Sequence, residues 1–105
     1  MSRICFVSNE IYPVAPGGAG TLIYEIVQLL LREKYEIILV LDIPGHAFEQ
    51  LEKYELLSWS NNTNCRLYHV DRLCKNIDRQ KSDFQSRYMW ESYRYDFACR
   101  QVYEI

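Results

Sequence analysis

The chain has 105 residues and a formal net charge of −2, with 49% hydrophobic and 25% charged residues. This composition is typical of one small globular domain and excludes a disordered or collagen-like protein. No apolar run approaches the roughly 18 residues that a membrane span needs. The basic residues do not cluster as they do in a nucleic-acid-binding protein. We therefore expect one domain, residues 1–105, with no transmembrane segment and no nucleic-acid partner.

The cysteines and the N-terminus indicate the compartment. Cys5, Cys65, Cys74 and Cys99 form no C-x-x-C pair, and His69 stands at no standard ligand spacing from them. This spacing argues against a bound metal. The N-terminus lacks the pattern of a secretory signal. The sequence therefore predicts reduced thiols, no metal site and a cytoplasmic location.

The first third of the chain alternates between strand and helix patterns. Residues 4–8 are a nearly continuous apolar run of strand length, and residues 36–42 are a second such run. Between them, residues 21–34 carry apolar side chains at helical spacing. Such a βαβ unit is almost always right-handed and makes two parallel strands.

The rest of the chain has weaker patterns. We expect a helix over 47–57, a third strand over 65–70, an irregular charged stretch over 71–82 and a long helix over 83–105. The stripe that this helix would bury is Phe84, Tyr88, Tyr95, Ala98 and Val102. The predicted fold is α/β, a Rossmann-like parallel sheet with helices on both faces. Because the chain stops within the last helix, we expect an incomplete part of a longer protein.

The loop over residues 9–20 carries the clearest functional signal. It follows the first strand and contains Gly17, Gly18 and Gly20 where the first helix begins. Ligands of open α/β sheets bind at the carboxyl ends of the strands, and helix N-termini favour phosphate. The absence of a Cβ lets a ligand approach the backbone. The sequence therefore predicts that these glycines bind a diphosphate, or, as the alternative, that they only supply a positive φ in a turn.

Two common phosphate motifs are absent from this loop. A P-loop needs a lysine after its last glycine, and no lysine occurs before Lys34. A dinucleotide fingerprint starting at Gly18 needs a small residue where Ile23 stands. Asp42, at the end of the second strand, stands where a ribose-binding acid would. A nicotinamide-binding domain therefore remains an alternative.

The order of these features resembles a known family. A strand ending in Ser-x-Glu at 8–10, a proline-containing loop, Gly-Gly-x-Gly at 17–20, an amphipathic helix and a buried strand are similar to the N-terminal domain of family 4 glycosyltransferases. Glycogen and starch synthases share the pattern, but they carry a lysine just before the glycines where this chain has Pro16. The resemblance implies half of a GT-B fold, the acceptor-side domain, without the C-terminal nucleotide-sugar domain.

The resemblance also implies an activity. Such enzymes transfer a sugar from a nucleotide-sugar donor to an acceptor with retention of configuration, and generally need no metal or other cofactor. By position, Gly17 and Gly18 would approach the donor phosphates and Gly20 would shape the turn. The 105 residues alone would be inactive, and the full-length protein would be cytoplasmic or peripheral to a membrane.

The sequence contains four further side chains that could belong to a site. Glu10 and Tyr12 project from the same loop and would line the acceptor side; alternatively, Tyr12 covers the sheet edge and Glu10 is solvated. His46 and His69 match no motif, so the sequence assigns no catalytic residue. The remaining alternative is a non-catalytic binding or assembly domain, in which the aromatic helix over 83–105 packs on a partner or forms an oligomer.

Overall fold

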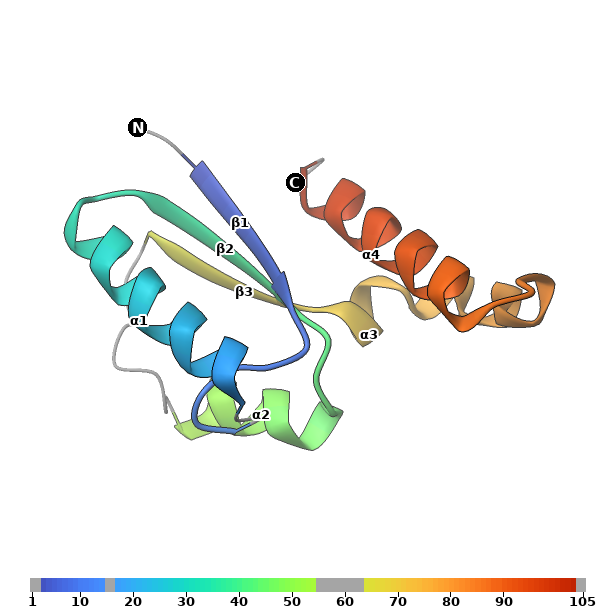
Figure 1. Cartoon of the computed structure of the whole chain (residues 1–105), viewed down its shortest axis with the longest axis horizontal. Helices are drawn as coiled ribbons and strands as arrows, with labels where there is room; N and C mark the ends of the chain where they lie inside the picture. Colours follow the sequence, from blue (N-terminus) through green and yellow to red (C-terminus); the bar gives the residue numbers. More distant parts are fainter. Residues whose placement is uncertain (1–2, 15–16, 55–63, 104–105) are drawn as a thin grey trace.

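A computed structural model describes residues 3–14, 17–54 and 64–103 of the chain (Figure 1). The elements follow in the order β1 (Arg3–Ser8), α1 (Gly18–Arg32), β2 (Glu36–Leu41), α2 (Gly45–Tyr54), β3 (Cys65–His69), α3 (Val70–Leu73), the 3-10 helix η1 (Lys75–Asp83) and α4 (Arg87–Tyr103). The predicted strands are confirmed to within a residue or two at each end. Residues 55–57 and 104–105 of the expected helices lie outside the described residues.

The three strands form one parallel sheet in the order β1-β2-β3. β1 pairs with β2 from Arg3 opposite Glu36 to Ser8 opposite Leu41, and β2 pairs with β3 up to Leu41 opposite His69. All three strands therefore end at the same edge of the sheet. The predicted α/β class with a small parallel sheet is confirmed.

One face of the sheet packs against α1 and α2 (Figure 1). Because side chains alternate along a strand, Ile37, Leu39 and Leu41 of β2 point to this face. The helices contribute the following buried side chains to the same core: Val27, Leu31, Ala47, Phe48 and Leu51. None of these residues is more than 7% exposed. Their burial accounts for the helical spacing that the sequence shows.

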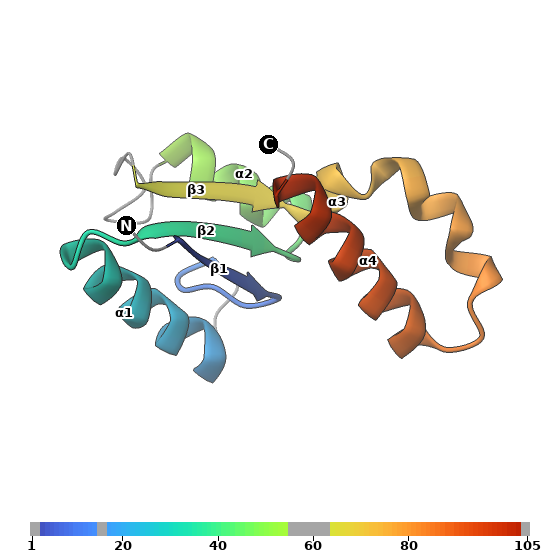
Figure 2. The ribbon, with the colours of Figure 1, turned by 90° about the horizontal axis from the view of Figure 1, so that it is seen from above.

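The opposite face of the sheet packs against α4, so the sheet has helices on both faces as predicted. Ile38 and Val40 of β2 lie in this second core, together with the following residues from α3 to α4: Val70, Cys74, Ile77, Trp90, Ala98 and Val102. Figure 2 shows that the chain continues beyond the strand ends after β3 and then turns back as α4. The second half of α4 therefore covers the sheet, and its first turns extend past it.

Three sequence expectations are wrong in detail. The stretch over 71–82 is not irregular, because α3 and η1 run through it. Tyr88, expected in the buried stripe, is 82% exposed, since the first turn of α4 extends past the sheet. Leu22 and Leu29 belong to the apolar helical pattern over residues 21–34 and were expected on its buried side. They are 57% and 56% exposed, because α1 buries only one narrow side against the sheet.

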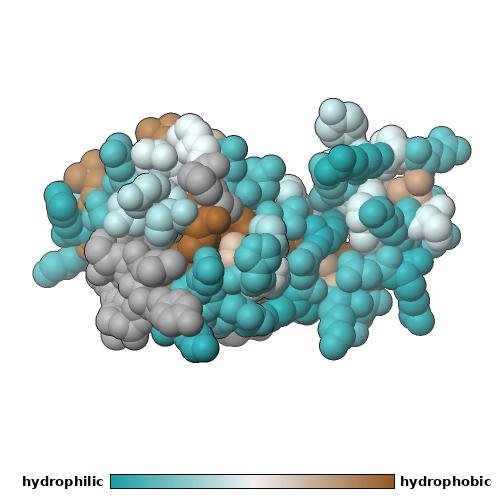
Figure 3. Space-filling view, turned by 90° about the horizontal axis from the view of Figure 1, so that it is seen from below, coloured by the Kyte–Doolittle hydropathy of each residue, from teal (hydrophilic) through white to brown (hydrophobic). Residues whose placement is uncertain are grey.

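The surface differs between the two ends of the molecule. On the face that Figure 3 shows, more apolar surface is visible on the side of α1 and α2 than on the part formed by η1 and α4, which is mostly hydrophilic there. Among the described residues, no helix combines the length and the apolar character that crossing a membrane requires.

Candidate functional site

The loop between β1 and α1 is held by hydrogen bonds of Ser8 and Glu10. The hydroxyl of Ser8 accepts from the backbone N–H of Glu10 at 3.0 Å and donates to the backbone carbonyl of Glu10 at 2.8 Å. The carboxylate of Glu10 in turn accepts from the backbone N–H of Gly20 at 3.1 Å. Gly17, at the N-cap of α1, offers no side-chain cap. Glu10 therefore caps α1 from outside the helix, where a negative charge is favourable.

Gly17 and Gly20 are required for close approach rather than for unusual backbone angles. No described glycine has a positive φ, and Gly17 is extended at φ 174°. A Cβ on Gly20 would lie 2.9 Å from the backbone nitrogen of Ile11, and a Cβ on Gly17 would collide with the carboxyl group of Glu10. The alternative in which the glycines only supply a positive φ is therefore wrong.

The start of α1 is open at Gly18. Apart from its chain neighbours and the backbone of α1, no atom of the described residues lies within 4 Å of the position that a Cβ of Gly18 would take. By contrast, the N–H of Gly20 already binds Glu10, whose carboxylate also lies beside Gly17. A diphosphate arriving here would therefore meet an open helix start at Gly18 and a negative charge at Glu10.

The second loop residue singled out by the sequence, Tyr12, lies on α1. Its ring packs edge-on against the ring of Tyr24, with centroids 5.2 Å apart, and Tyr12 remains 47% exposed. Glu10 is half-buried and hydrogen-bonded, so the alternative that it is simply solvated is wrong. The structure thus brings Glu10 together with Gly17 and Gly20, and leaves one side of Tyr12 accessible.

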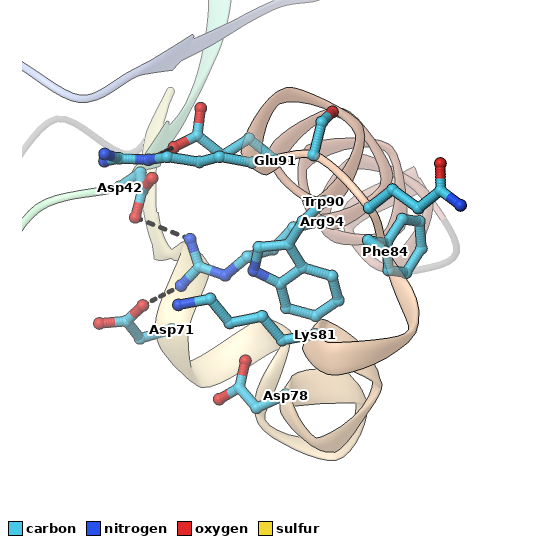
Figure 4. A pocket seen from close by; sticks show the side chains of 11 residues that line it. Asp42, Asp71, Asp78, Lys81, Phe84, Trp90, Glu91 and Arg94 are labelled. Atoms are coloured by element: carbon cyan, nitrogen blue, oxygen red, sulfur yellow. Dashed lines mark hydrogen bonds and ion pairs between the residues drawn. The ribbon is translucent and has the colours of Figure 1, made fainter.

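A cavity of about 670 Å³ opens at the same edge of the sheet (Figure 4). Its walls come from Asp42 directly after β2, from Asp71 in α3, from η1, from the turn after η1 and from the first half of α4. The lining residues are Asp42, Asp71, Asp78, Lys81, Phe84, Gln85, Ser86, Arg87, Trp90, Glu91 and Arg94. The volume falls within the roughly 300–1,000 Å³ of small-molecule sites.

Arg94 connects α4 to the ends of two strands. Its guanidinium donates to Asp42, which follows β2, at 2.9 Å, and to Asp71, which follows β3 (Figure 4). The second carboxylate oxygen of Asp42 accepts from the hydroxyl of Tyr95 at 2.6 Å. Both oxygens of Asp42 are thus engaged within the protein, which argues against its use as a ribose ligand in a nicotinamide site.

The pKa values of Arg94 and Tyr95 reflect this cluster. Burial alone lowers the pKa of Arg94, but the hydrogen bond to Asp42 and the charges of Asp42 and Asp71 outweigh it and raise that pKa. Burial, followed by the hydrogen bond to Asp42, raises the pKa of Tyr95. Arg94 therefore stays charged and the Tyr95 hydroxyl stays protonated. The carboxylates of Asp42 and Asp71 thus keep a positively charged partner.

Three polar groups of the cavity wall lack a partner among the described residues. Trp90 is only 6% exposed, and its indole N–H has no acceptor in the part of the chain that the structure describes. Lys81 and Asp78 line the cavity without an ion pair or side-chain hydrogen bond there. Phe84 packs on Trp90 with ring centroids 5.4 Å apart, so the wall beside these groups is aromatic.

His69 and three of the four cysteines have structural surroundings, whereas His46 is exposed. His69 is buried, its Nε2 lies 2.7 Å from the carbonyl oxygen of Ile43, and its ring stacks on Phe48. Burial raises the pKa of the Cys5, Cys65 and Cys74 thiols to about 11, so they are protonated at neutral pH. Within the described ranges, no group of three or more His, Cys, Asp or Glu side chains is placed to hold a metal ion.

Sequence reasoning placed the glycine loop correctly at the strand ends but did not find the cavity. Arg94 lies 52 residues from Asp42 and 23 from Asp71, and no local pattern reports such a contact. The only available signals were Asp42 at a strand end and the aromatic composition of α4. No protein-family model matches the chain, and neither a curated protein nor a solved structure matches it.

Proposed function

We propose that the chain is the acceptor-side domain of a retaining glycosyltransferase, which transfers a sugar from a nucleotide-sugar donor to an acceptor. The observation that carries the proposal is the open helix start at Gly18, placed at the carboxyl edge of β1 within the loop that resembles the family 4 pattern. A pocket large enough for a small molecule opens at the same edge of the sheet.

The chemistry of this role follows from charge. In sugar transfer, the bond between the anomeric carbon and the diphosphate oxygen breaks, and the oxygen of the acceptor hydroxyl forms the new bond to that carbon. The proton of the hydroxyl passes to the departing diphosphate. Negative charge grows on the departing diphosphate. Backbone N–H groups at a helix start stabilise such charge without reorganising. Gly18 offers that position with no side chain in the way.

Binding at this loop is tested by nuclear magnetic resonance on the 105-residue chain. Uridine- and guanosine-diphosphate sugars and inorganic pyrophosphate are titrated, and the backbone amide signals from Gly17 to Gly20 are followed. We expect saturable shifts centred on Gly18 with all three ligands and no sugar transfer, because the nucleotide-binding half of the cleft is not in this chain. Shifts with NAD alone would favour the nicotinamide alternative, and transfer by this chain would contradict the division into two halves.

Glu10 gives the proposal a sharper test. Glu10→Gln keeps an oxygen that can accept from Gly20 but removes the charge that faces an incoming diphosphate. We therefore expect this variant to bind pyrophosphate several-fold more tightly. Glu49→Gln is the matched control, since Glu49 is exposed on α2 and the change in net charge is the same. Equal effects of the two variants, or no binding near Gly18, would refute the site.

The assembly alternative is favoured by one observation. Tyr88 and Met89 at the start of α4 are 82% and 56% exposed, and Tyr103 near its end is 72% exposed. Sedimentation of the chain over a range of concentrations tests this role. A stable dimer that binds no nucleotide sugar, and that dissociates in Tyr88→Ser, would replace the transferase proposal with an assembly function.

A further inference from the structure

The cavity under α4 contains a buried donor without an acceptor. Trp90 is 6% exposed, and its indole N–H finds no acceptor among the described residues. In Figure 4 the indole ring lies beside Arg94 and Lys81, with its nitrogen on that side of the ring. A buried donor without an acceptor is unfavourable. A ligand that brings an oxygen acceptor to this point would satisfy it.

The charges of the wall select among ligand classes. Arg94 is paired with Asp42 and Asp71, and Arg87 with Glu91 at 2.9 Å. What remains is one cation, Lys81, and one anion, Asp78, both without a partner in the described ranges.

An anionic ligand would satisfy Lys81 but would also face the carboxylate of Asp78. A cationic ligand would satisfy Asp78 but would also face the ammonium group of Lys81. A hydroxyl group both donates and accepts. A neutral molecule with several hydroxyls can therefore donate to Asp78 and accept from Lys81 and Trp90 at the same time.

The shape and the aromatic surface agree with a ring-shaped molecule. The cavity holds about 670 Å³, and Phe84 and Trp90 form part of its wall. Pockets of this kind combine aromatic side chains with a few polar groups that fix the orientation of the ligand. The C–H face of a saturated ring would lie on the aromatic wall, while its hydroxyls reach the polar groups.

We propose that this cavity binds a neutral polyhydroxylated ring, a sugar or a cyclitol, with one hydroxyl oxygen accepting from the indole N–H of Trp90. The binding residues are Trp90, Lys81 and Asp78, and Arg94 holds the wall in place through Asp42 and Asp71. The role of this ligand as the sugar acceptor rests on the function proposed above, whereas the binding itself does not.

The indole N–H signal of Trp90 provides a direct readout. The sequence has one other tryptophan, Trp59, which is replaced by phenylalanine so that only the indole signal of Trp90 remains. Glucose, N-acetylglucosamine and myo-inositol are titrated in turn, with inorganic phosphate as the anionic probe and choline as the cationic probe. We expect at least one neutral polyol to shift the Trp90 signal saturably, and the charged probes to leave it unchanged.

Two outcomes overturn the inference. A saturable shift with phosphate or choline but with no polyol would assign the cavity to a charged ligand. No saturable shift with any polyol would show that the unpaired N–H is not a ligand contact. Because pyrophosphate binding is read at Gly18 and polyol binding at Trp90, failure of this inference and failure of the proposed function are distinguishable.

A pair of lysine variants tests the assigned contacts. Lys81→Met removes one donor from the cavity wall, and we expect it to weaken polyol binding about fivefold. Lys75→Met is the matched control, because Lys75 is exposed on the same 3-10 helix and does not line the cavity. Both lysines are exposed, so neither change should affect folding, which the amide spectrum verifies. Equal affinities in the two variants would remove Lys81 from the site.

Discussion

The carboxylate of Glu10 accepts a hydrogen bond from the backbone N–H of Gly20, and the two residues are so close that a Cβ on Gly20 would lie 3.0 Å from the Cβ of Glu10. This contact joins the loop after β1 to the first turn of α1, between residues ten positions apart in the sequence. The glycines therefore have a structural role that precedes any ligand: they let the helix start lie against the strand end.

Gly20→Ala tests this close approach. The added Cβ would lie 2.9 Å from the nitrogen of Ile11, and overpacking of this kind costs about 1–3 kcal/mol of unfolding free energy. Gly18→Ala is the matched control, since its Cβ would enter open space and we expect a change within about 0.5 kcal/mol. Urea denaturation of both variants checks the difference. Equal losses would show that backbone flexibility, not contact, sets the requirement for glycine.

The ion pair between Arg94 and Asp42 is expected to contribute to stability, unlike the surface pairs. Their side chains are only 12% and 24% exposed. Asp42→Asn removes the charge that faces Arg94, and we expect a loss of about 1.5–3 kcal/mol. Asp96→Asn breaks an exposed pair with Arg100 on the same helix and should cost less than about 1 kcal/mol. The prediction fails if thermal or urea unfolding ranks the two variants in the opposite order.

The end of α1 contains a residue in an unfavourable conformation. Lys34 has φ 66° and donates its N–H to the carbonyl of Leu31, while the N–H of Tyr35 reaches the carbonyl of Leu30. This is the Schellman arrangement, in which glycine is preferred. Lys34→Gly relieves about 1–2 kcal/mol of strain in the folded state. It also raises the conformational entropy of the unfolded chain, which offsets part of this gain. We expect a net gain of about 0.5–1 kcal/mol.

The neighbouring residue supplies the control for this change. Glu33 has φ −84°, so glycine relieves no strain there and only raises the conformational entropy of the unfolded chain. We expect Glu33→Gly to lower the unfolding free energy. A gain in stability from both variants, measured by urea denaturation, would contradict the assignment of strain to Lys34.

The partly buried thiol of Cys65 predicts a loss of stability at alkaline pH. Burial raises the pKa of Cys65 to about 11 from an ordinary value of 9.0. The folded state thus holds its proton over a range in which the unfolded chain releases it. The contribution of this thiol to the free energy of unfolding is complete below pH 9 and is lost as the pH rises from about 9 to about 11.

Cys65→Ala isolates this contribution. Other groups titrate in the same range, so the wild type and the variant are compared in urea denaturation at about pH 8 and about pH 10.5. We expect the wild type to lose more stability between the two values than the variant does. The comparison at the lower pH gives the packing cost of the substitution by itself. Parallel losses in both proteins would show that Cys65 ionises equally in the folded and unfolded states.

The fold was predictable where apolar patterns are local. The five apolar residues from Ile37 to Leu41 are at most 7% exposed, and a continuous apolar run of this length predicts a strand buried on both faces. Leu22 and Leu29 matched the helical pattern equally well, yet α1 packs against the sheet with only one side. The width of the buried side depends on the neighbouring layer, which periodicity does not report.

The region after β3 was less predictable for a different reason. Residues Lys75–Asp83 form a 3-10 helix in which only Ile77 is buried, so the sequence shows little apolar pattern there. Tyr88 was misplaced because its helix extends beyond the sheet, an arrangement set by tertiary contacts. The cavity likewise depends on Arg94 reaching strand ends that are distant in the sequence. Such long-range pairings leave no periodic signal.

In the part of the chain that the structure describes, the sheet has three strands, so β1 and β3 are its outer members. An outer strand presents main-chain groups that can template an extended segment from another molecule. Arg3, paired with Glu36 and more than half exposed, puts a charge at one end of β1, and Val7 near the other end is 37% exposed. Association of this protein in concentrated solution is therefore expected to proceed by growth of the parallel ladder, with a rise in β-structure, as well as by contacts between helices.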